Sequence, residues 1–199
     1  ASSNARLARY YFETDSQYQV AAFAVSRKYL SETVFEGLPV IALEDIASEY
    51  SPSEFEAFVA TGYKQMNKIR ENLYTECKNM GYKLTSYISS RCTFLSQFPP
   101  GDNCFILEDN TIQPYTKIGN NVVLWSGNHI GHDVTIEDHC YITSHVVISG
   151  FVNIKQNCFL GVNAALRDGI TIARETLIGA GAVIMNDTIE KGVYLPPRS

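Results

Sequence analysis

The chain has 199 residues, of which 45% are hydrophobic and 19% charged, and a formal net charge of -5. These values predict one or two folded domains with a real core and exclude a disordered tail. The acidic balance argues against nucleic acid or an acidic membrane as the main partner. No apolar run approaches the roughly 20 residues that span a bilayer, and no signal peptide is visible. The five cysteines are odd in number and lack a CxxC pair, which indicates reduced thiols in a cytoplasmic protein.

The first part of the chain, residues 1–98, predicts a small α/β domain of Rossmann-like type. The periodicity indicates strands at 19–25, 40–42 and 56–60, and helices at 7–12 and 64–80. Strands that alternate with helices favour a parallel sheet. The first helix begins at the very start of the sequence, so we expect that the first strand of the domain is missing from it.

Two segments of this domain are candidate substrate-binding sites. Ser2, Ser3 and Asn4 are helix N-cap residue types, and the N–H groups of a helix start can hold a diphosphate, with simple capping as the alternative. Gly62, Tyr63 and Lys64 follow a strand end, which is where α/β folds bind ligands. Lys64 can pair with phosphate or remain solvated.

The second part, residues 102–195 after a Pro-Pro-Gly boundary, contains an internal repeat. Every sixth residue from Ile106 to Ile184 is Ile or Leu, which gives 14 positions without an insertion. The residue two places earlier is small or β-branched, and Cys104, Cys140 and Cys158 fall there as small inward hydrophobes. A period of six fits neither a helix nor strand alternation, but it fits a short strand and a corner. Three such units close a triangular coil of 18 residues, and the coils stack at about 4.8 Å.

The 18-residue period aligns the corners in three columns of residue types that tolerate left-handed backbone. The columns are Asn121, His139, Asn157, Glu175; Gly127, His145, Asn163, Gly181; and His132, Gly150, Asp168, Asn186.

Five segments carry a resemblance to a known family: 62–70 (GYKQMNKIR), 128–133 (NHIGHD), 144–150 (SHVVISG), 157–163 (NCFLGVN) and 178–182 (IGAGA). They resemble the hexapeptide-repeat acyltransferases, in particular the NeuD-like sialic acid O-acetyltransferase family. That branch has a small Rossmann-like domain before a left-handed β-helix, and it includes N-acetyltransferases of bacterial surface glycans such as the lipopolysaccharide O-antigen.

The resemblance implies an acetyl-CoA-dependent N-acetyltransferase of a nucleotide-linked amino sugar. It implies a homotrimer without a metal. Acetyl-CoA would lie between neighbouring coils, and the nucleotide sugar on the N-terminal domain would point its amine into that groove.

The resemblance also assigns catalytic residues, and the chemistry agrees. Amide formation from a thioester needs a base near pH 7, which favours histidine, and a donor for the oxyanion. The resemblance makes His132 the base and Asp133 the acid that orients it. The period places Gly150 one coil above His132, where its N–H can meet the thioester oxygen.

The remaining candidates line the expected groove. The cofactor candidates, which let pantetheine approach the backbone or turn the coil tightly, are Gly150, Gly161, Val162, Asn163, Gly179 and Ala180. His145 can line the acyl groove, and His129 can line the active site or face the neighbouring subunit. We expect His139 to be a turn residue, and Trp125 and Tyr115 to pack at the subunit interface.

Three other functions stay open. The same fold can transfer an acyl group to a sugar hydroxyl, which would make the protein an O-acetyltransferase, and the acyl group can be longer than acetyl. A zinc lyase of the γ-carbonic anhydrase kind uses the same coil with three histidines. A non-catalytic scaffold is the third alternative.

Overall fold

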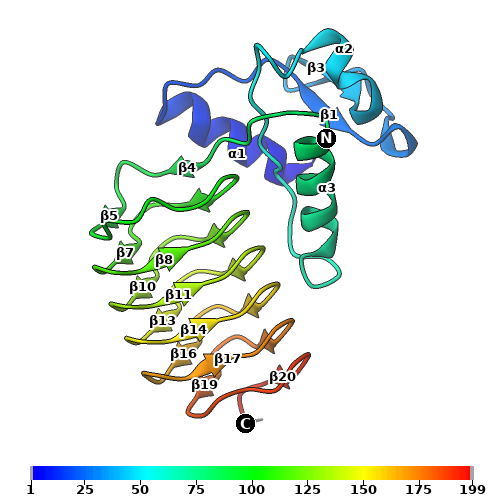
Figure 1. Ribbon diagram of the computed structural model, residues 1–199. Coiled ribbons are helices and arrows are strands. Elements are labelled where there is room, and N and C mark those ends of the chain that lie inside the picture. Colours follow the sequence, from blue (N-terminus) through cyan, green and yellow to red (C-terminus); the bar gives the residue numbers. More distant parts are fainter. Residues whose placement is uncertain (1, 198–199) are drawn as a thin grey trace.

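A left-handed parallel β-helix forms the larger part of the molecule (Figure 1). The computed structural model describes residues 2–197, and in that range the coil has three parallel sheets. The seven-stranded sheet contains β4 (Tyr87–Ile88), β6 (Phe105–Ile106), β9 (Val123–Leu124), β12 (Tyr141–Ile142), β15 (Phe159–Leu160), β18 (Leu177–Ile178) and β20 (Val193–Tyr194). The six-stranded sheet contains β5 (Thr93–Phe94), β7 (Thr111–Ile112), β10 (His129–Ile130), β13 (Val147–Ile148), β16 (Ala165–Leu166) and β19 (Val183–Ile184). The four-stranded sheet contains β8 (Lys117–Ile118), β11 (Thr135–Ile136), β14 (Asn153–Ile154) and β17 (Thr171–Ile172).

The hexapeptide repeat builds the interior of the coil, as predicted. Strands pair in register with residues one coil away, so Ile130 lies between Ile112 and Ile148. All 14 Ile and Leu positions are buried. Complete burial of such a side chain stabilises a fold by about 1.5–3 kcal/mol. The ladder of aliphatic side chains is therefore the main source of the coil's stability.

The three cysteines of the repeat also point inward, which confirms that prediction. Cys104, Cys140 and Cys158 are fully buried. Burial raises the pKa of Cys104 to about 12 and that of Cys140 well above its usual range. The three side chains therefore pack as small hydrophobes inside the coil.

Two of the three predicted corner columns are correct, and the third is wrong by one residue. The first two columns have positive φ, for example at Asn121 and Gly127. At the third corner the left-handed residues are Asp133 (φ 56°), Phe151 (φ 60°) and Gly169 (φ 71°), not His132, Gly150, Asp168 and Asn186. The reason is a constant offset: between Asp109 and Gly181, every left-handed residue follows an inward Ile or Leu by three positions.

The coil begins earlier in the chain than residue 102. β4 pairs with β6 and β5 pairs with β7, so the segment after Tyr87 already forms part of the first coil. The prediction placed the boundary at the Pro-Pro-Gly segment because the six-residue Ile/Leu pattern starts only at Ile106. The sheet pairing, and not that pattern, defines the start of the coil.

The N-terminal region is a small α/β arrangement, but its sheet is mixed and not fully parallel. β1 is parallel to β3, whereas β2 and β3 form an antiparallel hairpin.

No helix in residues 2–197 has both the length and the apolar character needed to cross a membrane. The elements are α1 (Ser3–Thr14), β1 (Phe23–Val25), η1 (Arg27–Tyr29), β2 (Val34–Phe35), β3 (Leu38–Ala42), η2 (Leu43–Asp45), α2 (Ile46–Glu49) and α3 (Lys68–Asn79).

One predicted element of this region is wrong, and another begins later than expected. The segment 56–60 is not a strand: only Ala57 forms a bridge, to Leu84, and the N–H of Val59 donates to Oδ1 of Asn103 at 2.7 Å. The side chain of Asn103, which belongs to the coil, therefore takes the place that the backbone of a neighbouring strand would have. The helix expected over 64–80 begins only at Lys68, because the three residues before it have positive φ.

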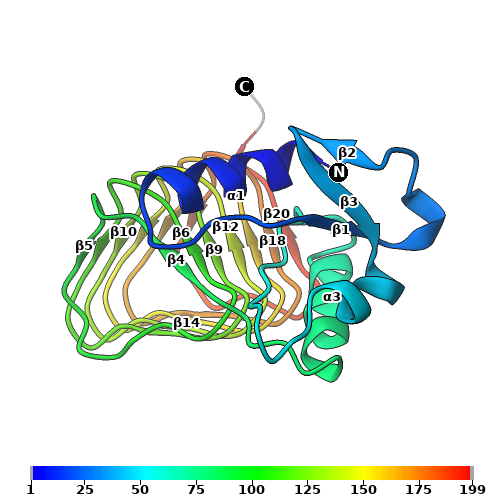
Figure 2. The same ribbon diagram turned by 90° about the horizontal axis from the view of Figure 1, so that it is seen from above.

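Helix α1 packs on the coil, along the outer face of the seven-stranded sheet (Figure 2). Its buried residues Ala8 and Phe12 share a cluster with Tyr87, Phe105 and Tyr141. These aromatic side chains point outward from their strands, since Ile and Leu occupy the inward positions. The N-terminal region and the coil therefore share a hydrophobic core.

Candidate active site

The corner between the six- and four-stranded sheets, here the His132 corner (residues 131–134), brings together the predicted catalytic residues. His132 follows the end of β10, and Asp133 takes the left-handed turn into β11. Nδ1 of His132 lies 3.0 Å from Oδ2 of Asp133. The backbone N–H of His132 donates to Oε1 of Gln113 at 2.9 Å, which fixes the backbone below the ring. Both side chains are about half exposed, 49% and 42%, so the pair is open to a ligand.

Gly150 occupies the same corner one coil further on, as the period predicts. A Cβ on Gly150 would lie 2.9 Å from both Cε1 and Nε2 of His132, so the imidazole lies directly against this glycine. The N–H of Phe151 donates to the carbonyl of His132 at 3.0 Å and holds the two coils together. The N–H of Gly150 has no hydrogen-bond partner within residues 2–197. An imidazole, an adjacent carboxylate and a free backbone N–H thus meet at this corner.

Of the six predicted cofactor residues, Gly150 lies at the His132 corner, and the other five lie on a different edge of the same chain. Gly161–Asn163 and Gly179–Ala180 form the corner between the seven- and six-stranded sheets, here the Asn163 corner. A Cβ on Gly161 would lie 2.5 Å from the backbone N of Ala180, so coil stacking requires glycine there. Val162 is 42% exposed on this edge. Within one chain, the six-stranded sheet separates these residues from His132.

The other two candidate histidines are exposed and lie apart from His132. His145 is at the Asn163 corner, where its ring packs on Gly127. His129 is on the outer face of the six-stranded sheet, in register between Thr111 and Val147. His139, at the third corner, is a turn residue as expected, with φ 64°.

The two predicted substrate segments meet at the start of α1. The hydroxyl of Ser2 accepts from the N–H of Ala5 at 3.3 Å, so Ser2 caps the helix. A Cβ on Gly62 would lie 3.3 Å from Nδ2 of Asn4, which places these segments in contact. The ring of Tyr63 packs on the coil, 4.6 Å from that of Phe159. Lys64 is exposed.

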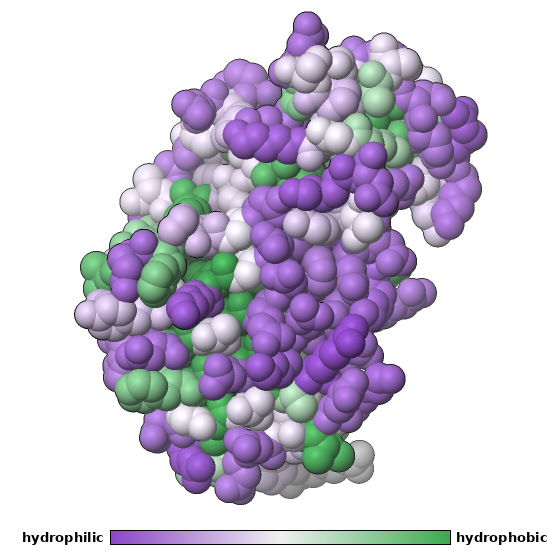
Figure 3. Space-filling model, viewed as in Figure 1, coloured by the Kyte–Doolittle hydropathy of each residue, from purple (hydrophilic) through white to green (hydrophobic). Residues whose placement is uncertain are grey.

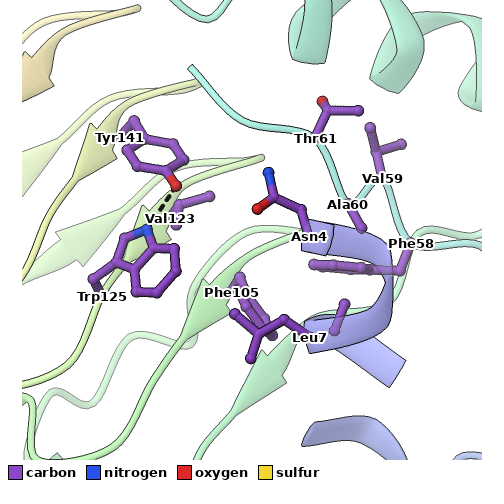
Figure 4. A pocket seen from close by; sticks show the side chains of 11 residues that line it. Asn4, Leu7, Phe58, Val59, Ala60, Thr61, Phe105, Val123, Trp125 and Tyr141 are labelled. Atoms are coloured by element: carbon purple, nitrogen blue, oxygen red, sulfur yellow. Dashed lines mark hydrogen bonds between the residues drawn. The ribbon is translucent and has the colours of Figure 1, made fainter. Parts of the chain in front are cut away.

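A small pocket lies beside this contact (Figure 4). The amide of Asn4 points between one wall formed by residues 58–61 and another formed by Trp125 and Tyr141. The buried hydroxyl of Thr61 lines it and has no hydrogen-bond partner within the described chain. An open groove of about 850 Å³ continues past Ser3, Arg6 and Tyr10. The lining thus combines aromatic and aliphatic side chains with the amide of Asn4 and the hydroxyl of Thr61.

Trp125 and Tyr141 are site residues that sequence reasoning missed. The Nε1–H of Trp125 donates to the hydroxyl of Tyr141 at 2.6 Å, and burial raises the pKa of Tyr141. Trp125, predicted as an interface residue, lines the pocket in this chain. One signal was available: Tyr87, Phe105, Tyr141 and Phe159 form an outward aromatic column with the 18-residue period, which indicates a covered face.

The part of the chain that the structure describes has no group of three His, Cys, Asp or Glu side chains that could hold a metal ion. The three corners separate the histidines, and the inward cysteines are sealed in the core. A zinc site of the γ-carbonic anhydrase kind therefore has no ligand set within this protomer.

Comparisons with known proteins agree with this architecture. Residues 115–150 match the family described as bacterial transferase hexapeptide (six repeats). The acetyltransferase domain of PglB from Neisseria gonorrhoeae superposes with a TM-score of 0.83 at 20% identity, covering 98% of this chain and 93% of its own. A variant of perosamine N-acetyltransferase from Caulobacter crescentus, in complex with CoA and GDP-perosamine, gives 0.86 at 21% identity, with 98% and 90% covered. WeeI from Acinetobacter baumannii gives 0.80 at 21% identity, with 95% and 88% covered. The chain therefore has the fold of these proteins along nearly its whole length.

Proposed function

We propose that the protein is an N-acetyltransferase that moves the acetyl group of acetyl-CoA to the amine of a nucleotide-diphosphate-linked sugar. The observation that carries this proposal is the His132 corner, where Asp133 orients the imidazole and Gly150 presents a free N–H. The likeness to perosamine N-acetyltransferase, solved with CoA and GDP-perosamine, supports both substrates. A cytoplasmic enzyme of bacterial surface-glycan synthesis fits this chemistry.

His132 acts as the general base. Asp133 accepts a hydrogen bond from Nδ1–H, which leaves Nε2 free to take the proton of the attacking amine. The amine nitrogen bonds to the thioester carbon, and the oxyanion that forms accepts from the N–H of Gly150. When the carbon–sulfur bond breaks, the proton on Nε2 can pass to the leaving thiolate. No acyl-enzyme is needed, since the amine attacks the thioester directly, and the inward Cys104, Cys140 and Cys158 are fully buried out of reach of a substrate.

A second protomer completes the site in this proposal. The acceptor pocket and the cofactor residues Gly161, Val162, Asn163, Gly179 and Ala180 lie on the Asn163 side of the coil, whereas His132 lies across the six-stranded sheet. In a homotrimer packed through that sheet, His132 of one chain would face the Asn163 corner of the next. Exposed hydrophobic residues support such packing: Val147 is 44% exposed and Val183 is 65% exposed on the sheet's outer face. Figure 3 shows hydrophobic residues gathered on the left part of the coil.

Val147→Asp is expected to convert the trimer to monomers and to abolish turnover, because a charge would be buried on the packed face. The side chain points outward from β13, so the monomer should remain folded. Light scattering measures the mass and circular dichroism the fold. Asn153→Asp, outward on the four-stranded sheet, is the control. A monomeric wild-type protein with full activity would contradict the trimer.

The acceptor is assigned to the pocket between α1 and the coil. Ser2, Ser3 and Asn4 would place N–H groups and an amide near the diphosphate, and Gly62, Tyr63 and Lys64 would close the other side. His145 would reach the groove from the Asn163 corner, and His129 would reach it from the outer face of the six-stranded sheet. Trp125 offers an apolar ring face for the sugar or base.

Trp125 is the single tryptophan of the chain, which makes acceptor binding directly measurable. Saturable quenching of its emission is expected with a nucleotide-linked amino sugar, because the indole lines the pocket. Acetyl-CoA alone should change the emission less. Equal quenching by both ligands, or none by any nucleotide sugar, would contradict the assignment of this pocket.

A screen of nucleotide-linked amino sugars with acetyl-CoA, followed by thiol release, tests the function. The mass of the product and its stability to mild base distinguish an amide from the ester of an O-acetyltransferase, and longer acyl-CoAs test the acyl length. Absence of CoA binding in calorimetry would favour a scaffold instead.

A further inference from the structure

Arg70 of α3 is completely buried at 0% exposure, although it is charged. Its guanidinium donates to three backbone carbonyls of the coil, on Asn121 (3.2 Å), His139 (2.8 Å) and Cys140 (3.1 Å). It also donates to the side-chain oxygens of Asn121 (3.2 Å) and Asn67 (2.9 Å), and to the carbonyl of Gly62 (3.4 Å). One side chain therefore joins α3, the segment before it and two coils.

The charge of Arg70 has no carboxylate within ion-pair distance in the described residues. Burial lowers its pKa to about 10, so the group is still charged at neutral pH. A buried charge is costly, and apolar residues in place of buried ionic groups are often neutral or stabilising. Stability alone does not account for an arginine here, so its geometry is the feature to explain.

Arg70 contacts Tyr141 of one pocket wall and Gly62, the residue that follows the other wall (residues 58–61). On one side its Nη1 meets the carbonyl of Gly62, whose Cα lies beside Asn4. On the other side its guanidinium carbon stands 5.4 Å from the ring centre of Tyr141, which accepts the hydrogen bond of Trp125. The distance between the two sides of the pocket thus depends on their contacts with the planar guanidinium of Arg70.

The turn before α3 adds a second, independent observation. Gln65, Met66 and Asn67 all have positive φ, 53°, 50° and 65°, which is unfavourable for residues other than glycine. Asn67 is buried, and its Nδ2 donates to the carbonyls of Asn157 (3.2 Å) and Cys158 (3.1 Å). Such a turn persists only where its surroundings hold it, and the hydrogen bond from Arg70 to Asn67 does so.

We propose that Arg70 is a positioning residue that sets the distance between the Gly62 segment and the Tyr141–Trp125 wall, and thereby the affinity for the acceptor. The proposal rests on the function proposed above. Arg70 touches neither the His132 corner nor the Asn163 corner, so acetyl-CoA binding and the chemical step do not depend on it directly.

Arg70→Met removes the planar donors and keeps most of the volume. We expect the KM for the acceptor to rise about tenfold or more, with the KM for acetyl-CoA within about twofold of wild type and kcat at saturation largely kept. Arg70→Lys keeps the charge but not the fork of donors, so an intermediate rise is expected. Arg174→Met is the matched control, since Arg174 is 48% exposed near the far end of the coil.

Trp125 fluorescence reports the pocket wall without any turnover. Both Arg70 variants should change the emission and its quenching by acceptor, and Arg174→Met should change neither. A purely structural role would instead lower the melting temperature with the acceptor KM and the emission unchanged.

The outcomes separate this inference from the proposed function. If the wild type transfers acetyl groups but the folded Arg70 variants keep the acceptor KM and the emission of wild type, the inference is wrong. If the wild type transfers nothing to any nucleotide amino sugar, the proposed function fails first. Should Arg70→Met not fold, Arg70→Lys decides by the same two measurements.

Discussion

His132→Ala is expected to lower kcat by about 100-fold or more, because general-base catalysis contributes on that scale. The substitution removes Nε2, the atom beside Gly150, while the coil backbone is held by the hydrogen bond from Phe151 to the carbonyl of residue 132. Thiol release with saturating substrates measures the effect. The KM values for both substrates should change little, since His132 acts on the proton of the amine.

Asp168→Asn is the control for this substitution. Asp168 lies at the same corner, one coil beyond Gly150, and is exposed. We expect it to keep the activity of wild type. If His132→Ala also kept near-normal kcat, His132 would have no part in the mechanism, and the base would have to be sought at the Asn163 corner.

Ile142→Ala is expected to lower the free energy of unfolding by about 2–5 kcal/mol, as large-to-small changes in close-packed cores do. Ile142 is 0% exposed and lies in register between Leu124 and Leu160 at the middle of the coil. The cavity cannot collapse easily, because backbone ladders fix the coils on both sides. Denaturant unfolding followed by circular dichroism measures the change.

Thr135→Ala, on the outward face of β11, is the matched control and should change stability by about 0.5 kcal/mol or less. A similar loss from both substitutions would mean that the inward ladder does not dominate the stability of the coil.

The sequence predicts the coil well because its physics is local and repeated. Each inward Ile or Leu repeats one contact pattern, so a fixed period determines strands, core and register together. The pairing of His132 with Gly150 follows from the same 18-residue step. The error at the third corner was one residue, since glycine and aspartate, which tolerate left-handed backbone, occur at both neighbouring positions there.

The N-terminal region was predicted less well because remote coil residues shape it. Asn103 takes the place of a strand partner for Val59, and Asn157 helps to hold the left-handed turn at Asn67. The local sequence pattern does not predict these contacts. Trp125 and Tyr141 were missed for the same reason: their environment is a surface that α1 and residues 58–61 create.

The uniform step from coil to coil also limits how such a chain can change its length. One residue inserted between His132 and Gly150 would turn every later aliphatic side chain toward solvent and carry the free amide away from the imidazole. Additions must therefore come as whole windings, or as loops that bulge out where the chain bends. Active length variants of this protein should therefore differ in the number of coils after Gly150. The single coil between His132 and Gly150 should keep its length.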